Sequence, residues 1–183
     1  REPALLFIGR LSEKSQLSLA LSALARAPCG ALALHVVGDG QDRAALERQA
    51  RRLGIDGRVH WHGATTDEAR IAAIANRCRM FLYPGDVGLS LIHALAYGLP
   101  AVLHSDTASH MPEIAAFAPG RNGVTFARGD AAGLATALAA IAADTARLDA
   151  MSATARATVE AEFNTARMAD RFVAGMAEVM GRA

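Results

Sequence analysis

The stretch YPGDVGLSLIHALAYGLPAV, residues 83–102, ends one apolar run, turns through Pro-Gly-Asp-Val-Gly and continues as a helical pattern rich in alanine and leucine. Pro84 and Gly85 end a predicted strand, because neither residue continues a central strand well. The following pattern predicts a helix from Leu89 to Tyr97. The stretch therefore predicts a strand, a tight turn and a helix, the unit from which parallel sheets are built.

The turn itself is a candidate phosphate site. We expect Gly88 to adopt an unusual backbone conformation before the helix. The N–H groups of Gly88, Leu89 and Ser90 would then point outward at the positive end of the helix dipole, where a phosphate is stabilised, and the Ser90 hydroxyl adds a donor. The alternative is that Asp86 or Ser90 only caps the helix and that nothing binds there.

Outward from this stretch, short apolar runs alternate with longer segments of helical period, which predicts parallel strands joined by helical crossovers. The predicted strands are ALLFIG, ALALHVVG, RVHWHG, MFLYP, PAVLH and GVTFA, which begin at residues 4, 31, 58, 80, 100 and 123. The other predicted helices span residues 16–26, 41–53, 67–77, 131–143, 147–162 and 165–180. We therefore predict an α/β fold of about six parallel strands, with helices on both faces and further helices at the C-terminus.

Composition favours one compact domain over residues 1–183, because 52% of the residues are hydrophobic and no linker or repeat interrupts the pattern. The longest apolar tract, residues 131–143, is too short to span a bilayer, and we expect a cytoplasmic protein. The formal net charge of +1 argues against a nucleic-acid partner and favours a small anion. Cys29 and Cys78 lack metal-ligand spacing and are predicted to be buried thiols.

Glycine recurs where predicted strands end. Gly9, Gly38, Gly63 and Gly85 each follow a different strand. In a doubly wound sheet, ligands bind outside the carboxyl ends of the strands, so these glycines favour one shared crevice, although any one of them could serve only its turn.

Two other enzyme motifs fit poorly. GLSLI at residues 88–92 resembles the nucleophile elbow of serine hydrolases, but the last position is Ile92 where that motif needs glycine. A dinucleotide-binding motif would need several glycines after the first strand, and GRLSEK has one.

Taken in order, FIGRLSEK (residues 7–14), VVGDGQDRAALERQARRLGIDGRVHWHG (36–63), GLSLIHALAYGLPAV (88–102), MPEI (111–114) and NGVTF (122–126) form a pattern that resembles glycosyltransferase family 4. The match is to the carboxyl-terminal, donor-binding lobe of the GT-B fold. It implies a Rossmann-like three-layer sandwich that binds a nucleoside-diphosphate sugar. The resemblance implies a separate acceptor-binding N-terminal lobe, which we expect to be missing from this chain because it opens at Arg1 directly before a strand.

The resemblance implies a bacterial enzyme of polysaccharide biosynthesis, a retaining glycosyltransferase of the hexosyltransferase type. It would transfer sugar to a glycan or lipid-linked acceptor held by the missing lobe, with peripheral membrane association of the full-length protein. The isolated lobe is expected to be inactive. We also expect the terminal helices to expose an apolar patch that the missing lobe would cover.

The resemblance also implies roles for single residues. Arg10 and Lys14 would neutralise the donor diphosphate as charge accumulates on the leaving group, so that no divalent metal or other cofactor is required. The family usually has two glutamates seven residues apart around the phosphate turn. Gly85 occupies the first position and His93 the second, so Asp86 is the candidate sugar contact and His93 the candidate ribose contact.

Further binding positions follow from the same resemblance. Gly63 and Ala64 would meet the nucleobase, Gly38 would close the crevice floor beside Gly9, and Glu113 would lie near the donor. The dipole of a helix that starts at Glu113 explains that glutamate nearly as well.

Four histidines have no assigned binding role. His60 and His62 share one strand face, but no third metal ligand is evident and packing explains them better. His104 and His110 follow the fifth strand without an assigned role.

Because both glutamates are missing, a nucleotide-binding module without catalysis remains an alternative. Another enzyme of the same two-lobe architecture, such as an epimerase, is a further alternative. An epimerase would turn over the donor without an acceptor.

Overall fold

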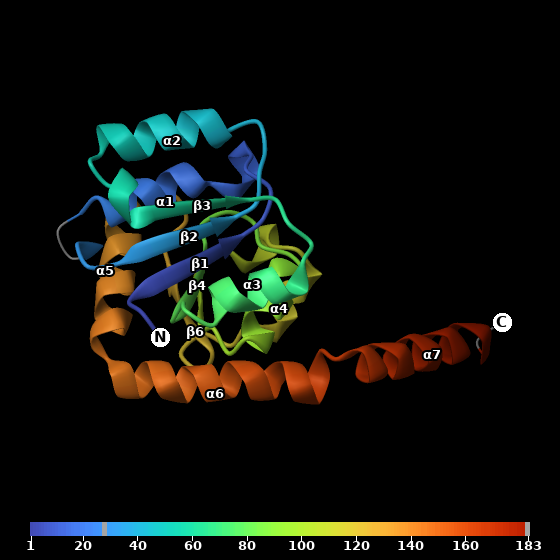
Figure 1. The fold of residues 1–183 in the computed structure, drawn as a ribbon. Helices are drawn as coiled ribbons and strands as arrows, with labels where there is room; N and C mark the ends of the chain where they lie inside the picture. The colour runs from blue at the N-terminus through green and yellow to red at the C-terminus, as the bar shows by residue number, and fades with distance from the viewer. Residues whose placement is uncertain (27–28, 182–183) are drawn as a thin grey trace.

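The computed structural model describes residues 1–26 and 29–181. Its centre is a six-stranded parallel sheet with the strand order β3-β2-β1-β4-β5-β6 (Figure 1). The strands are β1 (Ala4–Ile8), β2 (Ala33–Val37), β3 (Val59–Gly63), β4 (Met80–Tyr83), β5 (Ala101–His104) and β6 (Gly123–Phe126). The predicted α/β, Rossmann-like fold is confirmed, and each predicted strand is present.

The helices also lie close to their predicted positions. They are α1 (Leu17–Leu24), α2 (Arg43–Arg52), α3 (Glu68–Ala75), α4 (Ser90–Ala96), α5 (Ala131–Ala143), α6 (Thr145–Glu162) and α7 (Thr165–Gly181). Short 3-10 turns are η1 (Glu13–Ser15), η3 (Asp56–Arg58), η4 (Thr107–Ser109) and η5 (Pro112–Ala116). The sequence did not predict these turns, because three to five residues are too few to show a period.

Helices cover both faces of the sheet (Figure 1). Along β1, Leu5 and Phe7 join the core beneath α1, α2 and α5, whereas Ala4 and Leu6 join the core beneath α3, α4 and α6. Successive strand residues point to opposite faces, so a sheet covered on both sides needs apolar residues at nearly every position. This explains why the strands read as continuous apolar runs.

The strand order reverses beside β1. The chain winds outward from β1 through β2 to β3, then returns to place β4 on the other side of β1. In sheets of this kind, ligands bind at the carboxyl ends of the strands, beside the point where the strand order reverses.

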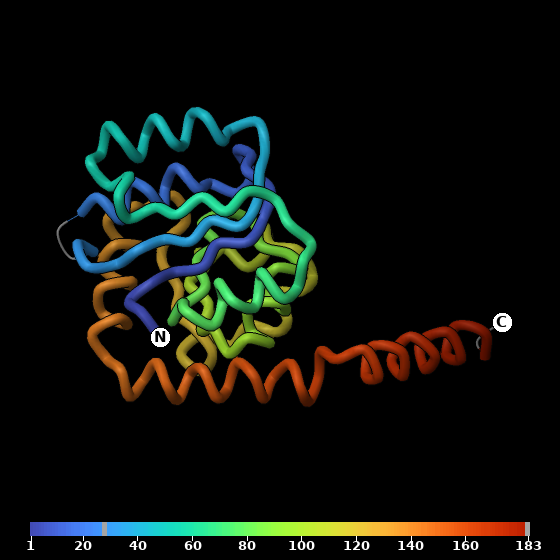
Figure 2. The backbone as a smooth tube through the Cα atoms, viewed as in Figure 1, coloured from blue at the N-terminus to red at the C-terminus, as the bar shows by residue number. Residues whose placement is uncertain are grey.

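The C-terminal helices differ in their packing. α6 lies along the body and buries Leu148, Met151 and Ala155, whereas α7 extends away from it and has no buried residue (Figure 2). α7 exposes large apolar side chains, with Phe172 70% and Val179 71% exposed. Among the described residues, no single helix has the length and apolar composition of a membrane span; only α5 and α6 joined across a 96° bend have them.

Both cysteines are buried free thiols, as predicted. Burial raises the pKa of both thiols, that of Cys78 to about 12. Both are therefore protonated and unreactive near neutral pH.

His60 and His62 pack against a third histidine that the sequence did not connect with them. His35 of β2 lies beside them because β2 and β3 are hydrogen-bonded neighbours. The ring centroids of His35 and His60 are 4.7 Å apart, and His35 Nδ1 lies 2.9 Å from His62 Nε2. Burial, followed by the charges of His60 and His62, lowers the pKa of His35 to about 4.

This cluster predicts destabilisation by acid. The unfolded chain binds a proton at His35 near its ordinary pKa of about 6.5, whereas the folded chain does so only near pH 4. The contribution of neutral His35 to the free energy of unfolding is therefore fully present above about pH 6.5 and is lost as the pH falls toward 4. The loss should approach 1.4 kcal/mol per pH unit for this one proton, as an order of magnitude. Urea unfolding of wild type and His35→Leu at pH 7.5, 6 and 5 measures the effect. We expect the free energy of unfolding to fall less steeply with decreasing pH in His35→Leu than in wild type. Equal slopes for the two proteins would contradict the prediction.

Candidate functional site

A hollow of about 340 Å³ lies at the carboxyl ends of β1, β2 and β3. Segments that are far apart in the sequence line it together, because parallel strands end at the same edge of a sheet. Its lining residues are Ile8, Gly9, Arg10, Val37, Gly38, Asp39, Gly40, Ala64 and Thr65. The structure thus brings together four residues that the sequence proposed separately: Gly9, Arg10, Gly38 and Ala64.

Two glycines shape this hollow. Gly38 has a φ of +148°, and a Cβ atom there would lie 1.9 Å from the Gly9 carbonyl oxygen. Gly63, with a φ of +73°, accepts a hydrogen bond of 2.9 Å from the Gly38 N–H. A side chain at position 38 would clash with the Gly9 backbone, so glycine there allows the close approach that forms the floor of the hollow; Gly63 is not among the lining residues.

Arg10 and Lys14 provide positive charge beside this floor. Both are exposed, and a second hollow of about 530 Å³ is lined by both. Within residues 1–26 and 29–181, neither side chain has a hydrogen-bond or ion-pair partner. Two unpaired cations at one edge can stabilise an anionic ligand without first breaking an existing ion pair.

The glycine-rich turn after β4 packs directly against the Lys14 segment. The Gly85 N–H donates to the Ser15 carbonyl oxygen at 3.1 Å. A Cβ atom on Gly85 would lie 1.9 Å from the Lys14 carbonyl oxygen. Gly85 matches the family's first glutamate position, yet no side chain fits there unless the Lys14 segment moves.

The N–H groups of Gly88, Leu89 and Ser90 have no hydrogen-bond partner in the part of the chain that the structure describes. α4 starts at Ser90, and no side chain caps it, so the capping alternative is wrong. The prediction for Gly88 is also wrong, because Gly88 is not among the residues with positive φ. Gly88 instead packs closely against neighbouring side chains: a Cβ atom there would lie 3.3 Å from Met111 Cγ and 3.7 Å from Glu113 Oε2.

Glu113, which the resemblance puts near the donor, lies close to the turn. Its Oε2 atom is buried and has no hydrogen-bond partner among the described residues. Glu113 lies in the short turn η5, so a long helix dipole does not account for it. A buried carboxylate oxygen without a partner is costly unless a ligand supplies a donor.

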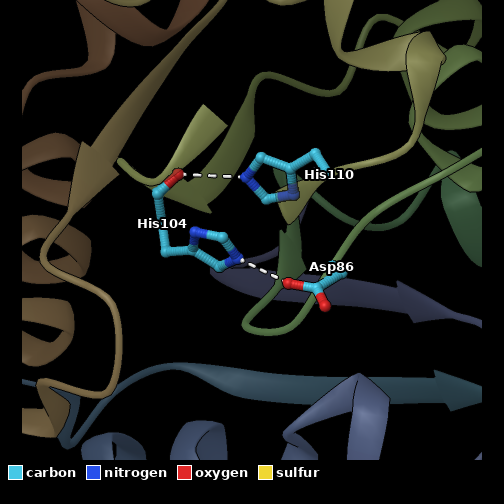
Figure 3. A group of neighbouring side chains, drawn as sticks. All are labelled: Asp86, His104 and His110. Atoms are coloured by element: carbon cyan, nitrogen blue, oxygen red, sulfur yellow. Dashed lines mark hydrogen bonds and ion pairs between the residues drawn. The ribbon is translucent and has the colours of Figure 1, made fainter. Parts of the chain in front are cut away.

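Two buried histidines hold the turn in place (Figure 3). The Val87 N–H donates to His110 Nδ1 at 3.1 Å, so the His110 proton is on Nε2, which donates to the His104 carbonyl oxygen at 3.1 Å. Burial, and then His110, lower the pKa of His104, whose Nε2 lies 3.3 Å from Asp86 Oδ1. The sequence assigned no role to His104 or His110; the structure shows that they connect β5 to the turn.

Arg128 joins the same carboxylate to another loop. Its guanidinium lies 3.1 Å from Asp86 Oδ1 and 2.8 Å from Asp106 Oδ2, so residues following β4, β5 and β6 are connected. Sequence reasoning missed Arg128 and Asp106, although both follow a predicted strand at the same edge of the sheet as the other candidates. Asp86 therefore already has two partners at Oδ1, and no described side chain engages its Oδ2.

Asp86, His104 and His110 also offer possible metal-ligand atoms within 4.8 Å of one another (Figure 3). Both ring nitrogens of His110 are, however, hydrogen-bonded to the backbone. Asp86 is additionally paired with Arg128. Metal binding would have to break these contacts, so the cluster is better explained as a support for the turn.

His93 lies on α4, three residues after Ser90, and is partly exposed. Its Nε2 atom lies 2.8 Å from Glu68 Oε1 of α3. Glu68 also accepts a short hydrogen bond from the Tyr97 hydroxyl. Sequence reasoning missed this carboxylate, because Glu68 is outside every motif.

Residues 2–144 match the protein family described as glycosyl transferases group 1. The chain belongs to this family. A lipopolysaccharide core biosynthesis glycosyltransferase, LpsE of Rhizobium meliloti (strain 1021), is 28% identical over 171 residues, which is 93% of this chain and 48% of LpsE. The lipopolysaccharide 1,6-galactosyltransferase of Salmonella typhimurium is 31% identical over 130 residues, 68% of this chain and 35% of that protein.

Solved structures share the fold. Anabaena HepE in complex with UDP superposes with a TM-score of 0.83 at 20% identity, over 97% of this chain and 49% of HepE. The sucrose-phosphate synthase of Thermosynechococcus elongatus gives a TM-score of 0.85 at 22% identity, over 100% of this chain and 46% of the synthase. This group 1 glycosyltransferase chain thus spans about half the length of these proteins or less.

Proposed function

We propose that this chain is the carboxyl-terminal, donor-binding lobe of a retaining, family 4 glycosyltransferase with the GT-B fold. It binds a nucleoside-diphosphate sugar, and the sugar passes to a glycan or lipid-linked acceptor held by a separate N-terminal lobe. The observation that carries the proposal is that Arg10, Lys14 and the N–H groups of residues 88–90 lie at one edge of the sheet beside a glycine-lined hollow. None of these groups has a partner among the residues that the structure describes. Similarity to two lipopolysaccharide glycosyltransferases supports an acceptor of this class.

The candidate residues at the carboxyl ends of the strands each have a role in this proposal. Arg10, Lys14 and the N–H groups of residues 88–90 hold the diphosphate and stabilise the charge that grows on it as the glycosidic bond breaks. Because these groups supply the positive charge, the proposal requires no divalent metal. Gly9, Gly38, Gly63 and Ala64 leave room for the nucleobase.

The remaining candidates contact the two sugars. His93 contacts the ribose, whereas Glu113 and Asp86 Oδ2 face the transferred sugar. We place the full-length protein in a bacterial cytoplasm, at the membrane surface where a lipid-linked acceptor would be found.

Calorimetric titration of the 183-residue chain with UDP, GDP and ADP tests the proposal. UDP is the first choice, because the HepE structure is a complex with UDP. Saturable binding of one diphosphate, and none of the matching nucleoside, supports a diphosphate site. If none of the three binds, the proposed site is wrong for this chain.

The missing first carboxylate favours a second candidate, a nucleotide-binding module without catalysis. A glutamate at position 85 is sterically excluded, and Asp86 is engaged by Arg128. Turnover of nucleotide sugar by the full-length protein separates the candidates. Binding without turnover, with the acceptor present, would support the module.

A further inference from the structure

Glu68 is a carboxylate that α3 places against the middle of α4. Its Oε1 atom accepts from the Tyr97 hydroxyl and lies 2.8 Å from His93 Nε2. The rings of His93 and Tyr97 are 5.3 Å apart, so the three side chains form one contiguous group. Glu68 reaches this group from the start of a different helix, after a loop that begins at the nucleobase hollow.

This group continues from the phosphate turn. Ser90 and His93 of α4, and Tyr97 directly after its last residue, are spaced by three and four residues and therefore lie on one face. Ser90 is at the start of that face, beside the free N–H groups, and Glu68 closes it near Tyr97. In the proposed function the diphosphate lies at the turn, and His93, three residues after Ser90, is the contact of the adjoining ribose.

Glu68 determines which nitrogen of His93 carries the proton. Hydrogen bonds, first from Tyr97 and then from His93, lower the pKa of Glu68, so its carboxylate is ionised and can only accept hydrogen bonds. His93 Nε2 must therefore be the donor. In the neutral imidazole, Nδ1 is then an acceptor, and it has no partner among the described residues.

We propose that Glu68 is a positioning residue that presents His93 Nδ1 as the hydrogen-bond acceptor for a ribose hydroxyl of the donor. The inference rests on the proposed function, and it adds Glu68, a residue outside the family motifs, to the proposed donor site. Glu68 of α3 and His93 of α4 together provide a hydrogen-bond acceptor. The resemblance puts a single glutamate at this position in the family. A carboxylate can accept from two hydroxyls, whereas the single lone pair of Nδ1 accepts from one.

The test compares UDP, GDP and ADP with their 2′,3′-dideoxy forms in calorimetric titrations of wild type and Glu68→Ala. We expect wild type to bind the ribose form about fivefold more tightly than the dideoxy form, the effect of one hydrogen bond. Glu68→Ala should remove this preference by weakening only the ribose form. Glu47→Ala is the matched control, because Glu47 is also a partly exposed glutamate paired with a basic side chain, Arg43, but lies on α2; it should keep the preference.

A double-mutant cycle shows whether Glu68 acts through His93. His93→Ala should also remove the preference, and Glu68→Ala should then have no further effect. A preference retained in Glu68→Ala, or a further loss in the His93→Ala background, would overturn the inference while nucleotide binding stands. If no diphosphate binds to wild type, the inference fails together with the proposed function.

Discussion

Replacement of Arg10 by alanine is expected to weaken binding of the nucleoside diphosphate by about tenfold or more. A charge-assisted hydrogen bond to phosphate contributes about 1.4 kcal/mol or more, which corresponds to that factor. Arg10 is exposed at two hollows and has no partner within the described residues, so its removal should affect the ligand more than the fold. Calorimetric titration of wild type and Arg10→Ala with UDP, GDP and ADP gives the ratio of their dissociation constants.

The control for this prediction is Arg51→Ala, which removes an exposed arginine from the last turn of α2. It changes net charge equally but should leave affinity within about twofold, because long-range attraction between exposed charges is screened by salt. The difference between the variants should shrink as the salt concentration rises. Equal affinities of Arg10→Ala and Arg51→Ala would remove Arg10 from the site.

Gly85→Ala is expected to destabilise the fold by about 3 kcal/mol or more, the upper range for an overpacked interior. The added methyl would lie 1.9 Å from the Lys14 carbonyl oxygen and 2.8 Å from the Ser15 carbonyl carbon. Both are backbone atoms, which cannot rotate away as a flexible side chain does. The Lys14 segment must therefore move, and the hydrogen bond from Gly85 to Ser15 lengthens. Urea unfolding measures the loss.

Gly57→Ala provides the control for this substitution. Gly57 has no positive φ, and nothing lies within 4 Å of the Cβ position. Its replacement should change stability by no more than about 0.5 kcal/mol, or raise it slightly by restricting the unfolded chain. If Gly85→Ala and Gly57→Ala have similar free energies of unfolding, the Lys14 segment can move away from the added methyl group at little cost, and the prediction is wrong. A Gly85→Ala chain that folds should also bind diphosphate less well, because Lys14 is displaced.

The fold could be predicted from sequence because every level of the pattern agrees. Apolar runs, glycine at the strand ends and helical periodicity all favour the same parallel sheet, and a sheet covered on both faces requires continuous apolar strands. The 13-residue helix α5 even has its predicted bounds, because Asp130 caps its start and its apolar residues recur regularly. Strand-end residues such as Arg10 and Gly38 could be found because topology places them at one edge.

The pairings within the site could not be predicted, because side-chain partners depend on how neighbouring elements approach. Glu68 and His93 are 25 residues apart and belong to helices whose contact no local pattern encodes. His35 meets His62 only because β2 and β3 are neighbours in a particular register. Gly88 shows the opposite error: the residue type suggested an unusual backbone conformation, whereas Gly88 has no positive φ and a Cβ atom there would lie 3.3 Å from Met111 Cγ.

The buried histidines that contact the turn after β4 have a consequence for binding entropy. His110 holds the Val87 N–H and His104 holds Asp86, so this part of the turn is ordered by contacts within the chain before any ligand arrives. Fixing the backbone of one residue costs about 1–2 kcal/mol of conformational free energy. Folding has already met this cost for the turn, and a ligand that binds there keeps more of its interaction energy as affinity.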